Sequence, residues 1–143
     1  MFELVDGKKT IFNGNEYYIV KDSKGICIYT WDKNIVDKSF IQVSGDEYTG
    51  YQTMYKKYVN KDQIGNIYNF TKKYEYKGFK VNCYNRSYKG DYWIGTDDKE
   101  VAEVIGYDEL YHDKYGEVVY FKQVNADDKD LVLLGEDRQV TYL

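Results

Sequence analysis

The chain contains no proline, although average usage of roughly 5% would place about seven in a protein of this length. Its 143 residues also include only one histidine and two cysteines. The single histidine is His112, so any histidine-based zinc site or serine–histidine relay would have to include this residue. Cys27 and Cys83 are too few for a disulfide framework, so we expect two buried, reduced thiols. We expect no metal, no other cofactor and no enzymatic activity.

Long apolar runs are also absent. The runs reach four residues, as in LVLL at 131–134, whereas a bilayer-spanning helix needs roughly 20. A secretory signal has basic residues followed by an apolar segment. The N-terminal MFELVDGKKTIF does not show this pattern. We therefore expect a cytoplasmic protein that does not associate with a membrane.

Tyrosine is abundant, with 18 residues in the chain. The hydrophobic fraction is 43% and the charged fraction 31%, which is typical of a globular protein with one ordinary domain or two very small ones. Lysine, asparagine and isoleucine are also common, while alanine and arginine are scarce. This bias matches AT-rich codons, so the tyrosine excess has two explanations at this point, codon usage and function.

Two octets resemble one another. YKKYVNKD (55–62) and YFKQVNAD (120–127) share five identical residues at a spacing of 65. Matches upstream keep nearly the same spacing, since Gly14 corresponds to Gly78 and Ile28 to Ile94. Single insertions in turns or bulges account for the small drift. The pattern predicts two tandem copies of one unit, 1–70 and 71–143, packed together as one body.

Each copy reads as mainly β. Asn13-Gly14 is a strong hairpin signal, because both residues can adopt positive φ. Ile26, Ile28 and Thr30 alternate with Cys27, Tyr29 and Trp31, which is typical of a strand. DYWIGT (91–96) repeats the pattern in the second copy. We expect a mainly β fold of two five-stranded units of about 65 residues, each an SH3-like or OB-like barrel or a β-meander.

One short helix is expected in each copy. In the second copy Asp97 can cap a helix, with Glu100 three residues later. Val101, Val104 and Ile105 then share one face, and Gly106 follows as a terminator. The corresponding segment of the first copy predicts only one or two turns.

Catalytic motifs are not found. The chain has no GxSxG, Walker or GxGxxG sequence. Carboxylates are plentiful, but no pair is singled out for acid and base work. A small carboxylate-dependent hydrolase is therefore the least favoured function.

Charge is unevenly distributed. Residues 72–89 carry a net charge of +5 and residues 96–138 a net charge of −8. The basic stretch alternates with aromatic residues, as in single-strand binders, but the whole chain has a net charge of −4, which disfavours nucleic acid. The acidic half instead indicates a protein partner of basic character.

Tyrosines gather in two segments that we expect to be loops, 45–55 and 107–116. Tyrosine among glycine and aspartate is typical of binding surfaces. We expect a non-catalytic binding protein, of the bacterial immunity or inhibitor type, that engages a protein partner. The alternative is a carbohydrate or cell-wall binding module that stacks sugars on tyrosine and tryptophan. The candidate binding residues are Tyr48, Tyr51, Tyr107, Tyr111, Tyr115, Trp31 and Trp93.

Overall fold

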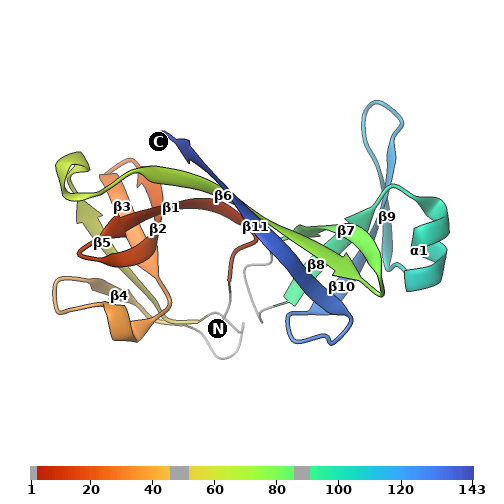
Figure 1. Ribbon diagram of the computed structural model, residues 1–143, viewed down its shortest axis with the longest axis horizontal. Coiled ribbons are helices and arrows are strands. Elements are labelled where there is room, and N and C mark those ends of the chain that lie inside the picture. The colour runs from red at the N-terminus through yellow and green to blue at the C-terminus, as the bar shows by residue number, and fades with distance from the viewer. Residues whose placement is uncertain (1–2, 46–51, 86–90) are drawn as a thin grey trace. The chain divides into compact units, whose positions relative to one another are not determined.

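The computed structural model describes residues 3–45, 52–85 and 91–143, and within them the fold is mainly β, as predicted (Figure 1). Tyr48 and Tyr51 lie outside the described residues. The strands are β1 Asp6–Phe12, β2 Asn15–Asp22, β3 Gly25–Thr30, β4 Ile41–Val43, β5 Met54–Val59, β6 Ile67–Tyr76, β7 Phe79–Tyr84, β8 Asp91–Thr96, β9 Glu109–His112, β10 Val118–Asn125 and β11 Leu131–Thr141. The helices are η1 Lys33–Ile35, η2 Lys61–Gln63 and α1 Lys99–Ile105.

The strands divide between two compact units. The first comprises residues 1–71 and 138–143, and the second residues 72–137. The strand order is β4-β5-β3-β2-β1-β6-β7-β8-β10-β9, and β11 pairs with β6 off this path. The described strands therefore form one eleven-stranded sheet, because β6 pairs with strands of both units. This pairing does not confirm the two separate five-stranded units that the sequence predicted.

The pairing follows the same order in each unit. In the first, β1 pairs with β2, β2 with β3, β3 with β5 and β4 with β5. In the second, β6 pairs with β7, β7 with β8, β8 with β10 and β9 with β10. The sequence did not predict β4 or β9, because three and four residues are too short to show a strand period.

The core of the first unit lies on one face of its strands. Asn13 and Gly14 have φ of 49° and 79° and form the predicted turn between β1 and β2. The turn fixes the register that places Phe12 and Tyr17 on the inner face, where Ile28 is fully buried. The Tyr17 hydroxyl donates a hydrogen bond to the carbonyl of Ile35 at the end of η1, which satisfies its polar end within the core.

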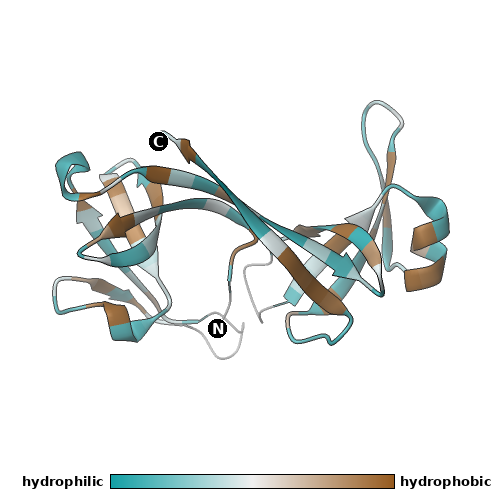
Figure 2. Ribbon diagram, viewed as in Figure 1, coloured by the Kyte–Doolittle hydropathy of each residue, from teal (hydrophilic) through white to brown (hydrophobic). Residues whose placement is uncertain are grey.

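The core of the second unit combines the inner face of β8 with α1. Ile94 on β8 is buried, as are Ala102 and Ile105 on the helix. The cap of α1 is Asp98, one residue later than predicted, and its carboxylate accepts hydrogen bonds from two backbone N–H groups. Val104, which the sequence places on one helical face with Val101 and Ile105, is 64% exposed, whereas Ile105 is buried. Figure 2 shows hydrophobic and hydrophilic residues side by side on α1 and along the strands.

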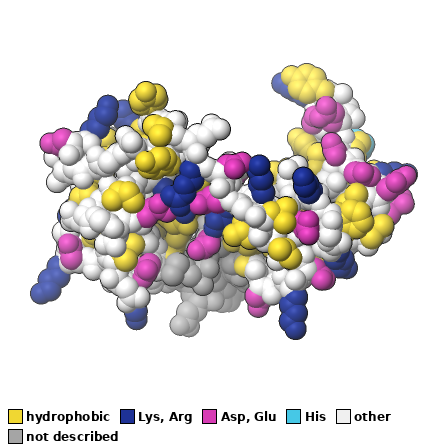
Figure 3. Space-filling view, viewed as in Figure 1, with side chains coloured by type: hydrophobic (Ala, Val, Ile, Leu, Met, Phe, Trp, Pro, Cys, Tyr) yellow, Lys and Arg dark blue, Asp and Glu magenta, His cyan; other side chains and the backbone are white. Residues whose placement is uncertain are grey.

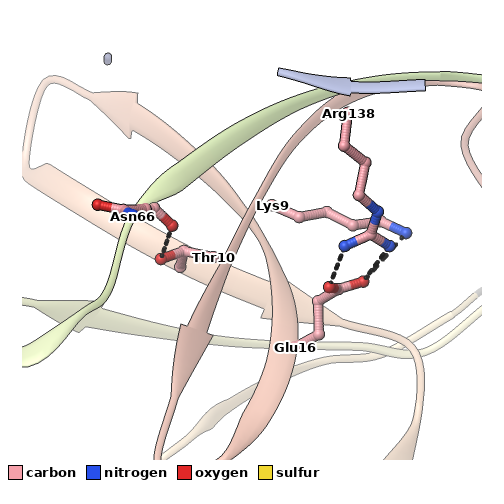
Figure 4. A network of polar contacts seen from close by, with 5 residues as sticks. All are labelled: Lys9, Thr10, Glu16, Asn66 and Arg138. Carbon is pink, nitrogen blue, oxygen red and sulfur yellow. Dashed lines mark hydrogen bonds and ion pairs between the residues drawn. The ribbon is translucent and has the colours of Figure 1, made fainter. Parts of the chain in front are cut away.

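The end of β11 is fixed to the first unit by a polar network (Figure 4). The guanidinium of Arg138 donates two hydrogen bonds to the carboxylate of Glu16, one of them 2.9 Å long. The Lys9 ammonium lies 3.4 Å from the same carboxylate. These contacts hold the pKa of Glu16 below its usual value, chiefly through the Arg138 hydrogen bond.

Two expectations about absent features can be compared with the structure. Cys27 is buried and Cys83 half-buried, and no disulfide joins them. Across the described residues no helix has the length and apolar character needed to cross a bilayer.

Candidate functional site

The outward side of the second unit's sheet is rich in aromatic side chains. Residues opposite one another in an antiparallel pair point to the same face. Trp93 on β8 is opposite Tyr84 on β7, and Tyr111 on β9 is opposite Val119 on β10. Phe121 lies two residues beyond Val119 and so shares this face. These five side chains, Tyr84, Trp93, Val119, Phe121 and Tyr111, are called the outer aromatic face.

A glycine makes room for the rings at its centre. Gly95 is opposite Phe121 on one side and Asn82 on the other. The rings of Tyr84 and Phe121 meet edge to face, with centroids 5.5 Å apart and planes at 61°. A Cβ added at Gly95 would lie 3.1 Å from the Tyr84 ring and 3.2 Å from the Phe121 ring. The missing side chain therefore allows the two rings to cover the strand.

The outer aromatic face is accessible and bordered by polar groups. Tyr111 is 58% and Tyr84 42% exposed, while the other members are half-buried. Asn82 and Gln123 are exposed on the same face. The Gln123 amide donates a hydrogen bond of 3.2 Å to the carboxylate of Asp91. The face can offer both apolar contact area and directional hydrogen bonds.

The hairpin that joins β9 to β10 is held by hydrogen bonds of Asp113, through both its backbone and its carboxylate. Asp113 accepts hydrogen bonds from the backbone N–H groups of Tyr115 (2.8 Å) and Glu117 (2.9 Å). Gly116 has φ of 82°, which suits glycine at this turn. Tyr115 is 79% exposed in this loop, with the Lys114 ammonium 5.0 Å from its ring centre. The loop thus displays a tyrosine from an ordered turn.

The structure separates the predicted tyrosines. Tyr107 contacts Tyr120 edge to face at 4.9 Å, and Tyr120 is opposite Leu110, so these side chains belong to the inner-face side of the sheet. Tyr111 was predicted in a loop but lies on β9. Of the predicted residues, Trp93 and Tyr111 belong to the outer aromatic face. Tyr107 contacts the other side of the same sheet, Tyr115 lies in the β9–β10 hairpin, and Trp31 belongs to the first unit.

Trp31 packs against tyrosines of its own unit. Its ring lies 5.4 Å from Tyr18 and 5.8 Å from Tyr29, edge to face in both cases. Tyr18 also contacts Phe70, which is almost fully buried. Burial raises the pKa of Tyr29. Trp31 therefore packs within an aromatic cluster of the first unit, apart from the outer aromatic face that includes Trp93.

Acidic groups surround the α1–β9 segment. Residues 97–117 contain eight acidic side chains and two lysines, a net charge of −6. Figure 3 shows acidic side chains gathered over α1 and the β9–β10 hairpin, next to hydrophobic ones. A concentration of one sign of charge beside an apolar surface attracts partners of the opposite sign.

The remaining features give little chemistry. No group of histidine, cysteine or acidic side chains that could hold a metal ion occurs among the described residues. A shallow pocket of about 360 Å³ in the first unit is lined by residues that include Lys24, Tyr58 and Lys61. The Tyr58 hydroxyl donates a 2.6 Å hydrogen bond to Asp22, and this bond raises the pKa of Tyr58 to about 12.

The sequence alone missed three members of the outer aromatic face, Tyr84, Val119 and Phe121. For each of them, the register of its strand with the neighbouring strands decides which side chains lie beside it on the sheet. The available signal was Gly95, since a glycine within a strand often marks a close approach of other groups.

Comparison with known proteins gives a family. The family model described as "Uncharacterised conserved protein UCP033725" matches residues 4–134, a range that includes the whole outer aromatic face. Neither a curated protein nor a solved structure matches the chain.

Proposed function

We propose that this chain, which belongs to the family of uncharacterised conserved proteins whose model it matches, is a non-catalytic protein that binds another protein. The observation that carries the proposal is the outer aromatic face together with the acidic segment 97–117, which is called the acidic border. Its most exposed members are Tyr84 and Tyr111, on β7 and β9. Tyrosine and tryptophan are enriched at the centres of protein interfaces.

The rigidity of the face favours binding. Its members project from paired strands and not from loops, and Tyr84 and Phe121 already contact one another. Side chains that are ordered before binding lose less conformational freedom in the complex. Each buried aromatic side chain contributes roughly 150–250 Å² of contact area, so this small face can anchor a partner.

The acidic border selects the partner's charge. With a net charge of −6 over residues 97–117, the surface attracts a basic protein and speeds its association. A small acidic binding protein of this kind suits a bacterial immunity or inhibitor role in the cytoplasm, which we propose as the biological setting.

We also propose that the chain arose by tandem duplication of a unit of about 65 residues. The equal order of strand pairing in the two units supports this. The register supports it too: Thr30 is opposite Tyr55 in the first unit and Thr96 is opposite Tyr120 in the second. In sequence, Tyr55 and Tyr120 begin the two similar octets, and Thr30 and Thr96 correspond at nearly the same spacing.

The caps after the third strand of each unit give independent support. The Thr30 hydroxyl accepts a 3.1 Å hydrogen bond from the N–H of Asp32, and the Thr96 hydroxyl accepts one of 3.1 Å from the N–H of Asp98. Each aspartate then accepts a 2.9 Å hydrogen bond from an N–H two residues later. Such caps are common at helix starts, and their equal place after the third strand of each unit agrees with two copies of one unit.

A carbohydrate or cell-wall ligand is the second candidate. The observation that favours it is the border of Asn82, Asp91 and Gln123 beside the aromatic rings, because sugar recognition combines ring stacking with hydrogen bonds to hydroxyl groups. The test is retention of the protein on insoluble polysaccharide. If wild type is retained and Trp93→Ala is not, this candidate is favoured over a protein partner.

The test of the first candidate is affinity capture from a lysate of the source cells with quantitative mass spectrometry. Tyr84→Ala and Tyr111→Ala should fold normally and should lose the protein that wild type retains. Tyr142→Ala is the matched control, because Tyr142 is exposed but lies in the other unit. Equal recovery of the same protein by all four chains would contradict the proposal.

A further inference from the structure

One strand beside the outer aromatic face has an edge without a partner strand. β9 is the last strand in the sheet order, and its register is with β10 alone; no other described strand pairs with it. Proteins usually protect such edges by keeping the strand very short, or with charged residues (above all lysine), proline or a bulge. β9 has only four residues and begins with Glu109, so its protection lies in its length and in one negative charge. β9 reads Glu-Leu-Tyr-His and contains no lysine or proline, and all four residues are exposed.

An added strand would find apolar contacts on both sides of this edge. Side chains alternate along β9, so Tyr111 belongs to the outer aromatic face and Leu110 to the opposite face. Leu110 is 44% exposed, and Tyr111 is more exposed than Leu110. Leu110 and Tyr111 therefore offer one apolar contact on each side of a strand added at this edge.

Both ends of β9 are fixed before any partner binds. At the start, the Asp108 N–H donates a 2.7 Å hydrogen bond to the Phe121 carbonyl, and its carboxylate accepts one of 2.9 Å from the Gln123 N–H. At the end, the Asp113 N–H donates a 2.9 Å hydrogen bond to the Glu117 carbonyl. The edge is therefore held extended, which lowers the ordering cost of pairing.

Charge identifies the occupant. A second copy pairing β9 with β9 would bring two segments of net charge −6 together, which is repulsive. The strand at the other end of the order, β4, lies in a less acidic part of the sequence, because residues 32–53 around it contain four acidic residues and two lysines, a net charge of −2. Of the two strands that end the order, β9 therefore has the stronger negative charge around it.

Resting on the proposed protein-binding function, we propose that β9 takes an extended, basic segment of the partner as an additional strand. The backbone of β9 supplies the hydrogen bonds, and Leu110 and Tyr111 contact alternate side chains of the segment. The acidic border pairs with its basic residues. Main-chain pairing of this type gives affinity, and the alternating side chains give specificity.

The test uses the full chain and a synthetic basic peptide, KVKVTVKV, with EVEVTVEV as the matched acidic control. Fluorescence anisotropy at low salt should show binding of the basic peptide alone, weakened by added salt. Hydrogen exchange should slow at the amides of β9 and not at those of β4. Two further versions of the basic peptide carry N-methyl groups on alternate amides. In the first version the methyl groups block one edge of the extended peptide, and in the second they block the opposite edge. One of them should bind at least about tenfold more weakly than the parent, and the other about equally, because only one edge pairs with β9.

Equal binding of both methylated peptides, or no binding of the basic peptide, would overturn strand addition. Hydrogen exchange at β9 that slows as the protein concentration rises, with no peptide present, would also overturn it. That result would show that a second copy of the chain pairs with β9. Capture of the natural partner that is lost in Tyr84→Ala would still support the proposed function, because Tyr84 is on β7, away from this edge. The two proposals can therefore fail separately.

Discussion

Gly95 provides a quantitative test of how the outer aromatic face is built. Replacing a strand glycine with alanine ordinarily stabilises a protein by roughly 0.5–1 kcal/mol, because it restricts the unfolded chain. At Gly95 the new Cβ would lie 3.1 Å from the Tyr84 ring and 3.2 and 3.3 Å from two atoms of the Phe121 ring. Overpacking of this kind costs about 1–3 kcal/mol. We expect Gly95→Ala to lower the free energy of unfolding by about 1 kcal/mol net.

Gly135→Ala is the matched control. Gly135 is also in a strand, and a Cβ there meets nothing within 4 Å. This variant should be as stable as wild type or more stable by up to about 1 kcal/mol. Urea unfolding followed by circular dichroism measures both, and a second substitution, Tyr84→Ala, should recover part of the loss in Gly95→Ala. If Gly95→Ala is as stable as Gly135→Ala, the rings do not depend on the missing side chain and the reasoning is wrong.

Two further predictions concern local contacts. Asp98→Ala should cost about 1 kcal/mol of unfolding free energy, because it removes the cap of α1; Asp97→Ala, at the cap position that the sequence suggested, should cost less in the same urea assay. The pKa of Glu16 is lowered in the folded state, so its pair with Arg138 stabilises the fold at any pH above the ordinary pKa of a glutamate. This stabilisation is lost as the pH falls through the folded-state pKa of Glu16. Glu16→Gln should therefore be less stable than wild type at neutral pH, by at most about 1 kcal/mol because the pair is partly exposed. The difference should vanish in acid, and a difference that stays constant with pH would exclude the ionic contribution.

The sequence predicted features that depend on few residues. The Asn13-Gly14 turn follows from the ability of both residues to adopt positive φ. The helix near residue 100 follows from a capping aspartate and a terminating glycine, although the choice between two adjacent aspartates needed the Thr96 hydroxyl that binds the Asp98 N–H. Local chemistry of this type is readable from the chain alone.

Features that depend on register were not predicted. Tyr84 and Phe121 are 37 positions apart in sequence, and they meet only because β7, β8 and β10 align Gly95 between them. Val104 looked like a core residue from helical periodicity, but α1 is short and turns its Ala102–Ile105 side to β8. Periodicity defines a face, whereas packing decides which face is buried.

The affinity for the captured partner tests the central claim most directly. With the partner purified, titration calorimetry on wild type, Tyr84→Ala and the control Tyr142→Ala gives three dissociation constants. We predict that Tyr84→Ala weakens binding at least about tenfold, as expected for an aromatic residue at the centre of an interface, and that Tyr142→Ala leaves it unchanged. Equal dissociation constants for all three would show that the partner binds elsewhere.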